Sequence, residues 1–483
     1  MSAPPGGDYR SPVPCGRAVV IGASMAGLLA ARVLANHFEQ VTVLERDALE
    51  SGPEVRKGVP QGRMLHVLLP RGREIVERYF PGYDRELLAA GAVSLRLPAD
   101  ALILTSAGWL DRRGPGLRLL SASRPLFEWT VRRRLQQLPG VTLLGRHDAA
   151  SLLTSHDGRQ VTGVMLRALD GETGRERRLA ADLVVDAGGR ASRAPAWLAE
   201  RGYPAPAQTH VDPDVGYASR IYRIPDGFRA DWQLVMISAQ APSMPRMGLL
   251  LPIEHDRWML GLMGAAGQHP PTDEDGFAAY LRSLRHPIIA DTVEKAEPLT
   301  PIRAYRGTVN RLLHYERMPS WPERFLVLGD AVCAFNPVYG QGMSTAAIAA
   351  ETLDDCLCRQ RRARSANHFG GLARRFQRQL ARRNTDPWLL STGEDLRFPT
   401  TTGMRVSHLM RVQHRYLDRV LAASSHDQAV AEAFVRVMGM VDRPVSLFAP
   451  RLLAAAARAQ HPGDDTGLAP PPGLLPASTT GRV

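Results

Sequence analysis

Cysteine is scarce in this sequence, at 4 of 483 residues. A chain of this length can bury a large core without disulfides. The cysteines lack the spacing of metal ligands: Cys15, Cys333, Cys356 and Cys358. We therefore expect no metal site and a reducing, cytoplasmic compartment.

Long apolar runs are missing as well. No segment reaches the roughly 20 apolar residues that a membrane-spanning helix needs. The Pro/Gly-rich N-terminus lacks the apolar stretch of a signal peptide. The sequence thus predicts no transmembrane segment, and we expect residues 1–16 to form a flexible leader.

Lysine occurs only at Lys57 and Lys295, so arginine supplies almost all of the positive charge behind the net value of +12. The arginine clusters at 132–134, 359–364 and 374–383 fall in helix-like segments without interleaved aromatic residues. Binding to nucleic acid is therefore not expected. Solvated helix faces account for the clusters, and a docking face for an acidic carrier protein or an anionic surface is the alternative.

The segment from Ala18 to Asp47 has the pattern of a βαβ unit. An apolar run of β type over 18–21 leads into a small-residue turn over 22–27. A helix-period stretch over 28–38 and a second β-type run over 41–44 follow, and the latter ends in Glu45. This order and spacing are typical of a dinucleotide-binding fold.

The turn suits the approach of a pyrophosphate. Gly22 permits a tight strand-to-helix connection, and Gly27 lets the helix pack closely against the strand. Ser24 takes the place of the usual middle glycine and is still small, and Met25 follows it in the turn. The N–H groups of the helix N-terminus can then bind phosphate, and Glu45 can accept hydrogen bonds from ribose hydroxyls.

The rest of the chain alternates between helix and strand patterns of the nucleotide-binding kind and alternating β runs typical of an antiparallel sheet. We expect a nucleotide-binding domain in three parts and a substrate domain made of a hairpin and a sheet. C-terminal helices, with breaks expected at the prolines that include Pro387, and a disordered tail follow. The predicted ranges are 17–99, 122–210 and 311–365 for the first domain, 100–121 and 211–310 for the second, 366–460 for the helices and 461–483 for the tail.

Three separated motifs point to one family. They are the turn of 22–27 with Glu45-Arg46, Ser123-Arg124 at a helix start, and Gly329-Asp330 followed by NPVYGQGM at 336–343. Together they resemble the FAD-dependent monooxygenases of the para-hydroxybenzoate hydroxylase and squalene epoxidase fold, over roughly residues 17–400. The strings KGVPQGR-x-x-H (57–66), SRPLFEW (123–129) and GDAVCAFNPVYGQGMS (329–344) are more similar still to bacterial epoxidases of polyether ionophore biosynthesis.

The resemblance implies an α/β fold in which a Rossmann-like FAD-binding domain is interleaved with an antiparallel-sheet substrate domain. Around the adenosine and pyrophosphate, Arg46 is expected to stack on adenine and a backbone group of Ala149 to touch it. Arg124 would approach the pyrophosphate and the ribityl chain. Asp330 would accept ribityl hydroxyls, which are suitable polar partners for a carboxylate at the end of an apolar strand.

The segment after Asp330 is expected to face the flavin ring. A helix N-terminus there would stabilise negative charge on reduced flavin, and glycines let backbone N–H groups come close. The residues expected to bind the ring in this way are Pro337, Gly340, Gly342 and Met343. Arg63 and His66 resemble residues on the flavin side of the cleft, with a capped or core histidine as the alternative.

One position departs from the related aromatic hydroxylases. They carry an Asp-Gly pair that serves both FAD and NADPH, and here Gly188 stands in place of that aspartate, after Asp186. The electron donor is therefore expected to be NAD(P)H, used either directly or through a separate flavin reductase.

An epoxidase of this family would transfer oxygen from a flavin C4a-hydroperoxide, formed with O2, to an electron-rich alkene. The protein must position the alkene and keep the site dry, so no catalytic side chain is expected. The expected substrate is a large apolar polyene of polyketide antibiotic metabolism, free or tethered to a carrier protein. Candidate lining residues under the antiparallel sheet are Trp109, Trp232, Met236, Met247, Leu249 and Met263.

Three other functions remain open on this sequence. An aromatic polyketide hydroxylase would use the same oxygen donor, with the Asp-Gly pair and a base for a phenol. A flavin halogenase would carry a Trp-x-Trp-x-Ile-Pro string, which is absent, and Lys57 stands in a different context. A non-catalytic, arginine-rich binding protein with a vestigial nucleotide fold is the third.

Overall fold

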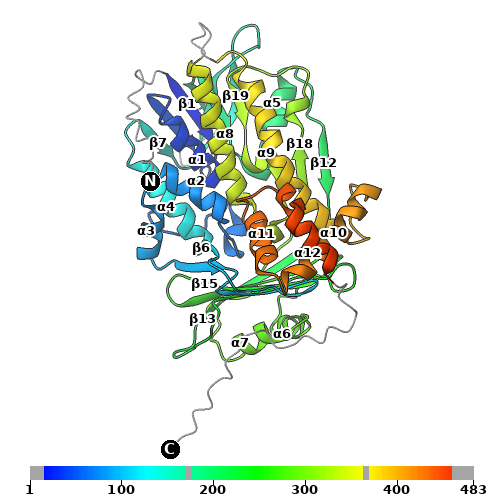
Figure 1. Ribbon diagram of the computed structural model, residues 1–483. Coiled ribbons are helices and arrows are strands. Elements are labelled where there is room, and N and C mark those ends of the chain that lie inside the picture. Colours follow the sequence, from blue (N-terminus) through cyan, green and yellow to red (C-terminus); the bar gives the residue numbers. More distant parts are fainter. Residues whose placement is uncertain (1–15, 170–175, 363–368, 460–483) are drawn as a thin grey trace, which may run out of the picture.

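The computed structural model describes residues 16–169, 176–362 and 369–459. Figure 1 shows a parallel sheet flanked by helices, a larger sheet lying across the molecule below it, and a group of C-terminal helices beside both. The predicted tail and the predicted leader up to residue 15 lie outside the described ranges. The predicted α/β class is confirmed.

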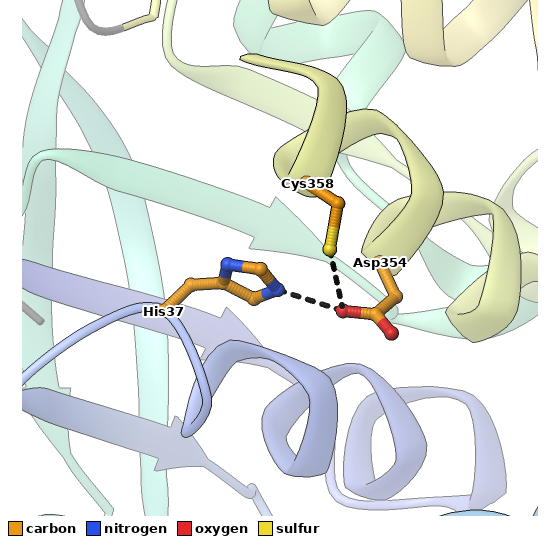
Figure 2. A group of neighbouring side chains, drawn as sticks. All are labelled: His37, Asp354 and Cys358. Carbon is orange, nitrogen blue, oxygen red and sulfur yellow. Dashed lines mark hydrogen bonds and ion pairs between the residues drawn. The ribbon is translucent and has the colours of Figure 1, made fainter. Parts of the chain in front are cut away.

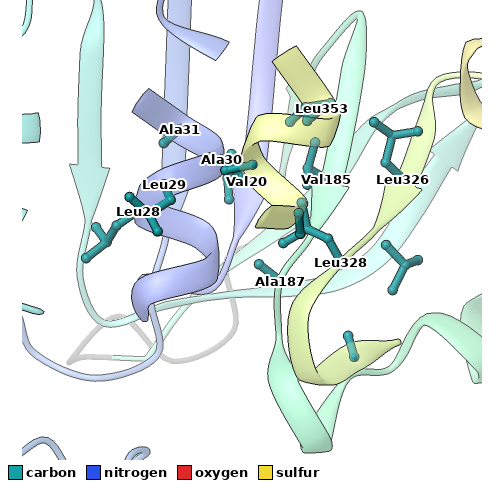
Figure 3. Close-up of a cluster of buried hydrophobic side chains, with 14 of the residues drawn as sticks. Val20, Leu28, Leu29, Ala30, Ala31, Val185, Ala187, Leu326, Leu328 and Leu353 are labelled. Carbon is teal, nitrogen blue, oxygen red and sulfur yellow. The ribbon is translucent and has the colours of Figure 1, made fainter. Parts of the chain in front are cut away.

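The first sheet is parallel throughout, with strand order β19-β11-β1-β2-β7. These strands are β1 (Arg17–Ile21), β2 (Gln40–Leu44), β7 (Val141–Leu144), β11 (Leu183–Asp186) and β19 (Phe325–Val327). Two helices lie side by side on the sheet, α1 (Met25–Leu34) and α8 (Gly342–Arg362). Figure 3 shows their apolar side chains packed with Val20, Val185 and Leu326 of the strands.

The βαβ unit is present where the sequence predicts it, although its helix is displaced. The helix α1 begins at Met25 and ends at Leu34, against a prediction of 28–38. Its first turn includes the small residues of the glycine turn because the pattern of buried positions already starts at Met25, which is 2% exposed.

Smaller elements complete the nucleotide-binding part. The helices are α2 (Pro70–Tyr79), α3 (Tyr83–Ala89), α4 (Arg124–Gln136) and α5 (Ala194–Glu200). One antiparallel sheet joins β8 (His147–Thr154), β9 (Val161–Ala168) and β10 (Glu176–Ala180). Another joins β12 (Gln208–Val211), β18 (Asn310–Leu313) and β20 (Cys333–Ala334).

The second large sheet has seven strands in the order β17-β13-β16-β15-β14-β4-β5. They are β4 (Ala101–Thr105), β5 (Gly108–Trp109), β13 (Gly216–Arg223), β14 (Leu234–Ile237), β15 (Arg246–Ile253), β16 (Arg257–Gly264) and β17 (Arg303–Tyr305). All neighbours are antiparallel except β14 and β4. Helices α6 (Glu274–Arg282) and α7 (Ile288–Val293) cover its outer face (Figure 1).

The region predicted as one hairpin, 100–121, splits between two sheets. The strands β4 and β5 do form a hairpin in the seven-stranded sheet. The next strand, β6 (Leu117–Ser121), instead pairs antiparallel with β3 (Val93–Leu97), which the sequence pattern did not reveal. A pairing partner more than 20 residues away leaves no local signal in either strand.

The C-terminal helices are α9 (Leu372–Asp395), α10 (His408–Ser424), α11 (Gln428–Met438) and α12 (Pro450–Arg458). The predicted break at Pro387 is wrong, because α9 continues through it. Pro387 and the adjacent Trp388 are buried, so packing of this part of the helix offsets the lost helical hydrogen bond. Within the described residues, no helix is long and apolar enough to span a membrane.

Candidate functional site

Two stretches far apart in the sequence meet at one edge of the parallel sheet. Strands β1, β11 and β19 are neighbours and parallel, so their carboxyl ends lie together. The turn at Gly22 follows β1, and the Gly329-Asp330 turn follows β19. A Cβ atom placed on Gly329 would lie 2.8 Å from the Cβ of Ala26 in α1. The edge is the usual ligand-binding position of an open α/β sheet.

The glycine turn is as tight as its sequence predicts. Gly22 has a φ of +98°, and a Cβ there would lie 2.6 Å from the carbonyl oxygen of Ala187. At Gly27 a Cβ would lie 1.8 Å from the carbonyl oxygen of Gly22. Ser24 occupies the N-cap position of α1, yet its side chain makes no capping hydrogen bond. The helix N-terminus is therefore open to an anionic group.

Glu45 supports this turn directly. Its Oε2 accepts a hydrogen bond of 2.8 Å from the backbone N–H of Ala23, and its Oε1 accepts one of 3.0 Å from the N–H of Asp47. A carboxylate has further lone pairs, so the predicted ribose contact is compatible with this role. The neighbouring Arg46 is exposed, as a side chain that stacks on a ligand base would be before binding.

A buried array of charges lies behind the turn, and the sequence did not reveal it. Glu128 of α4 contacts both Arg56 and Arg124, and these three residues are 5 to 8% exposed. Arg124 donates to Ser24 Oγ at 2.7 Å, and Ser24 donates to Glu128 at 3.0 Å. The second guanidinium nitrogen of Arg56, Nη1, lies 2.7 Å from Glu45 Oε2.

Within this array, Glu128 and Arg56 each favour the charged form of the other. Burial alone would raise the pKa of Glu128, but the guanidinium groups of Arg124 and Arg56 lower it below its usual value. Although burial opposes the charge of Arg56, Glu128 and Glu45 raise its pKa. Arg124 thus reaches the helix N-terminus from a fixed position. The only sequence signal for Glu128 was its place four residues after Arg124 on a predicted helix.

Asp330 is half-buried at the same edge. Among the described residues, no donor is hydrogen-bonded to its carboxylate, although Arg190, Arg124 and Arg311 are close enough to act on it electrostatically. Burial raises the pKa of Asp330, and these three arginines oppose the shift. A carboxylate that is partly withdrawn from water and lacks hydrogen-bond donors is costly in a protein, and the hydroxyls of a ribityl chain are donors that fit it.

The segment expected to face the flavin forms a 3₁₀ turn, Pro337–Tyr339, followed by α8 from Gly342. Pro337 is half-buried and Met343 is 4% exposed. Gly340 has a φ of +64°, and a Cβ on Gly342 would meet no atom within 4 Å. Open space in front of a helix N-terminus suits the edge of a flavin ring.

Three weaker assignments have different surroundings. Arg63 is exposed at the end of the 3₁₀ turn Pro60–Arg63. His66 Nδ1 lies 2.9 Å from the carbonyl oxygen of Met64, and burial with the nearby Arg124 lowers its pKa to about 3. His66 therefore lies on the site's side of the molecule and is neutral. Ala149 is 0% exposed on β8, so only its backbone could take part.

The six candidate substrate residues fall on opposite faces of the seven-stranded sheet. Met236, Met247, Leu249 and Met263 lie on the inner face, in a cluster that includes Met64, Leu65 and Val338 from the cofactor side. Trp109 and Trp232 belong to the outer cluster with α6 and α7. The structure does not bring these two tryptophans to the inner face: Trp109 points outward from β5, and Trp232 lies in the segment before β14 and packs in the outer cluster.

One group of three possible metal ligands occurs among the described residues. Atoms of His37, Asp354 and Cys358 lie within 4.8 Å of one another (Figure 2). His37 Nε2 is 2.7 Å from Asp354 Oδ1, and the Tyr79 hydroxyl donates to Asp354 Oδ2 at 2.9 Å. Arg361 also lies 3.4 Å from the other ring nitrogen of His37. The ligand atoms of His37 and Asp354 are already hydrogen-bonded, and the Arg361 guanidinium lies beside them. The group therefore connects α8 with the turn that follows α1.

The glycine turn, the unpartnered Asp330 and the open N-termini of α1 and α8 fit FAD. The FAD binding domain family matches residues 17–361 of the sequence. The chain belongs to this family. This FAD-binding chain is 35% identical over 435 residues to Protein Rv3254 of Mycobacterium tuberculosis, covering 89% of the chain and 90% of that protein. It is 27% identical over 369 residues to a kynurenine 3-monooxygenase of Salinispora tropica, covering 71% and 72%.

Solved structures show the same fold. A triple mutant of the flavin-dependent brominase Bmp2 aligns with a TM-score of 0.62 at 15% identity, covering 92% of this chain and 98% of that chain. PqsL, a probable FAD-dependent monooxygenase from Pseudomonas aeruginosa, aligns with a TM-score of 0.57 at 16% identity, covering 87% and 99%. The fold is thus that of FAD-dependent monooxygenases and halogenases, whereas specificity for polyether substrates has no counterpart among these relatives.

The role of Asp330 can be tested by its removal. The Asp330→Ala variant is expected to bind FAD about tenfold more weakly or worse, since hydrogen bonds to a charged group are lost. Its free energy of unfolding should change little, because the carboxylate has no protein donor among the described residues. Flavin absorbance per protein and urea unfolding measure the two effects. Asp291→Ala on α7 is the control, and equal flavin content in both variants would contradict the assignment.

Proposed function

We propose that this protein is an FAD-dependent monooxygenase that epoxidises C=C bonds of a large apolar polyene or polyketide. The main observation in support is the apolar inner face of the seven-stranded sheet. Met236, Met247, Leu249 and Met263 lie there, and Val338 of the turn before α8 packs against the same cluster. The residues that would meet substrate and those that would meet flavin therefore share one apolar layer.

Two residues packed in the inner cluster, Tyr217 and Tyr305, end in hydroxyl groups. The Tyr217 hydroxyl donates to Asn336 Oδ1 at 3.2 Å, and burial raises the pKa of both tyrosines. Neither is suited to deprotonate a phenol near neutral pH. An alkene needs no base, which favours epoxidation over aromatic hydroxylation.

When bound, FAD with O2 supplies an electrophilic oxygen atom. The chain's own residues bind the substrate and exclude water. The inner-face methionines and Leu249 desolvate and orient an apolar substrate. The turn before α8 closes the layer from the cofactor side and excludes water. His66, with a pKa lowered to about 3, adds no positive charge to the site.

A separate flavin reductase is the proposed source of electrons. Asp186 at the end of β11 is 0% exposed, and its carboxylate accepts hydrogen bonds from the Gly188 N–H at 2.8 Å and the Ser192 hydroxyl at 2.5 Å. The resemblance to aromatic hydroxylases places Gly188 where they carry an aspartate that serves NADPH, and both carboxylate oxygens of Asp186 are already hydrogen-bonded within this turn. Direct reduction by NADPH is therefore expected to be slow.

The proposal is tested with FAD-loaded protein, O2 and linear polyenes, phenols or halide with an aromatic acceptor. NADPH alone and NADPH with a generic flavin reductase are compared. Expected products are polyenes heavier by one oxygen atom, formed faster with the reductase. Oxygen entering only phenols would establish the hydroxylase instead, and halogenated products would establish a halogenase.

A matched pair of variants tests the inner face. Leu249→Gln is expected to raise KM for the polyene about tenfold and to increase H2O2 release, because an amide in an apolar layer costs roughly 1–3 kcal/mol. Trp109→Phe, on the outer face, should leave both unchanged. Steady-state oxygen consumption and peroxide detection measure this. Equal effects from the two variants would rule out the inner face as the substrate site.

A further inference from the structure

A buried polar cluster joins the C-terminal helices to the cofactor loop, which we define as residues 336–340. At its centre is the carboxylate of Asp395, the last residue of α9, which is 2% exposed. Asn310 of β18 and Asn336 of the loop are each 0% exposed beside it. Polar groups buried to this degree are normally all hydrogen-bonded. The cluster also lies partly beyond the part of the chain that matches the FAD-binding family, which ends at residue 361.

The Asp395 carboxylate binds donors from two elements at once. Asn310 Nδ2 donates to Oδ2 at 2.6 Å. Asn336 Nδ2 lies 3.1 Å from Oδ1 and 3.2 Å from Oδ2, and the Tyr339 hydroxyl donates to Oδ1 at 2.9 Å. Asn336 and Tyr339 are the first and fourth of the five loop residues, so one carboxylate binds the loop at its start and near its end.

A second layer of hydrogen bonds fixes the same loop to the sheets. The backbone N–H of Asn336 donates to Asn310 Oδ1 at 2.7 Å. Asn336 Oδ1 accepts from the N–H of Val338 and from the hydroxyl of Tyr217 on β13, both at 3.2 Å. With Asn336 oriented in this way, its amide nitrogen points at Asp395. An amide at position 395 would present its own NH2 group to these donors and could accept at one oxygen only.

We propose that Asp395 is a positioning residue for FAD, which acts by holding the cofactor loop in the conformation that meets the flavin ring. The inference rests on the proposed function only in placing this loop beside the ring. It does not depend on which substrate is oxidised. Asp395 itself makes no contact with the cofactor in this account, because its oxygens are committed to Asn310, Asn336 and Tyr339.

The cluster also predicts a pH dependence. Burial, with a smaller contribution from Glu394 on the same helix, raises the pKa of Asp395 to about 6, against the hydrogen bonds from Asn310, Tyr339 and Asn336. Tyr339 and Tyr217 face the carboxylate, and burial raises the pKa of both, so they stay neutral. As pH falls through about 6, Asp395 gains a proton and loses acceptor capacity toward the loop. FAD should then bind more weakly.

The test measures the dissociation constant of FAD between about pH 5 and pH 8, chosen to bracket the titration of this carboxyl. Wild-type protein should bind FAD more weakly below about pH 6. The Asp395→Asn variant should bind about tenfold more weakly at pH 8, as expected when hydrogen bonds to a charge are lost, and its affinity should fall less steeply than that of wild type below about pH 6. Glu394→Gln, which removes the adjacent charge, is the control and should resemble wild type at pH 8.

Exchanging the carboxylate at position 395 with the amide at position 336 distinguishes a positioning role of Asp395 from a general loss of stability. Asn336→Asp alone places two carboxylates together and should weaken FAD binding most. Combined with Asp395→Asn, it restores one carboxylate facing one amide, and FAD binding should recover in part relative to Asn336→Asp, because the amide at position 395 can still accept from only one of Asn310 and Tyr339. If Asp395→Asn is too unstable to purify, Tyr339→Phe removes one donor and should weaken binding by a smaller factor. Wild-type affinity in Asp395→Asn, or no recovery in the swap, overturns the role of Asp395. A wild-type chain that takes up no FAD would instead overturn the proposed function.

Discussion

The Gly27→Ala variant is expected to lose its FAD and about 3 kcal/mol of its free energy of unfolding. A Cβ atom at this position would lie 1.8 Å from the carbonyl oxygen of Gly22 and 2.9 Å from its carbonyl carbon. Both are backbone atoms, so α1 must move away from the turn after β1. Overpacking of this kind costs roughly 1–3 kcal/mol and occasionally more. The displaced helix N-terminus can no longer meet the pyrophosphate.

Urea unfolding and flavin absorbance per protein measure these two effects. Gly393→Ala in α9 is the matched control, because a Cβ there meets no atom within 4 Å. It should keep its FAD and gain slight stability, since alanine favours a helix over glycine. A Gly27→Ala protein with normal flavin content would show that the turn is not the pyrophosphate site.

The sequence contained enough information to predict the parallel sheet edge. The βαβ unit from Ala18 to Asp47 depends on local periodicity and on glycines with a steric reason, which the structure shows at Gly22 and Gly27. The Asp330 turn follows an apolar strand, and its place at the same site was implied by the family resemblance. The structure brings the two turns together because loops after neighbouring parallel strands share one edge.

Interactions between distant segments could not be predicted in this way. The pairing of β6 with β3, and the parallel pairing of β14 with β4, depend on neighbours far along the chain. The same limit explains Trp109 and Trp232, whose face of the sheet is set by strand register. Arg56 lies in a polar, turn-rich segment, and a charged residue there is usually solvated. Its burial becomes intelligible only once Glu45 and Glu128 are seen around it.

The Glu128→Gln variant should lower the free energy of unfolding of the FAD-free protein by about 3 kcal/mol. Glu128 is 6% exposed and is the shared partner of Arg56 and Arg124. Removing the negative member of a buried ion pair leaves uncompensated positive charge, which typically costs about 3–5 kcal/mol. Arg56 keeps Glu45 as a partner, at 2.7 Å, so the lower end of this range is expected.

FAD should stabilise this variant more than it stabilises the wild type. In the wild-type chain Arg124 donates hydrogen bonds both to Glu128 and to Ser24 at the helix N-terminus. Without the Glu128 charge, the pyrophosphate becomes the main anion for Arg124, so FAD binding and folding are linked more strongly. Thermal unfolding with and without FAD measures the difference. Glu86→Gln removes a more exposed partner of Arg133 and should cost at most about 1 kcal/mol, with the wild-type response to FAD. An equal or smaller FAD effect in Glu128→Gln would mean that Arg124 does not bind the pyrophosphate.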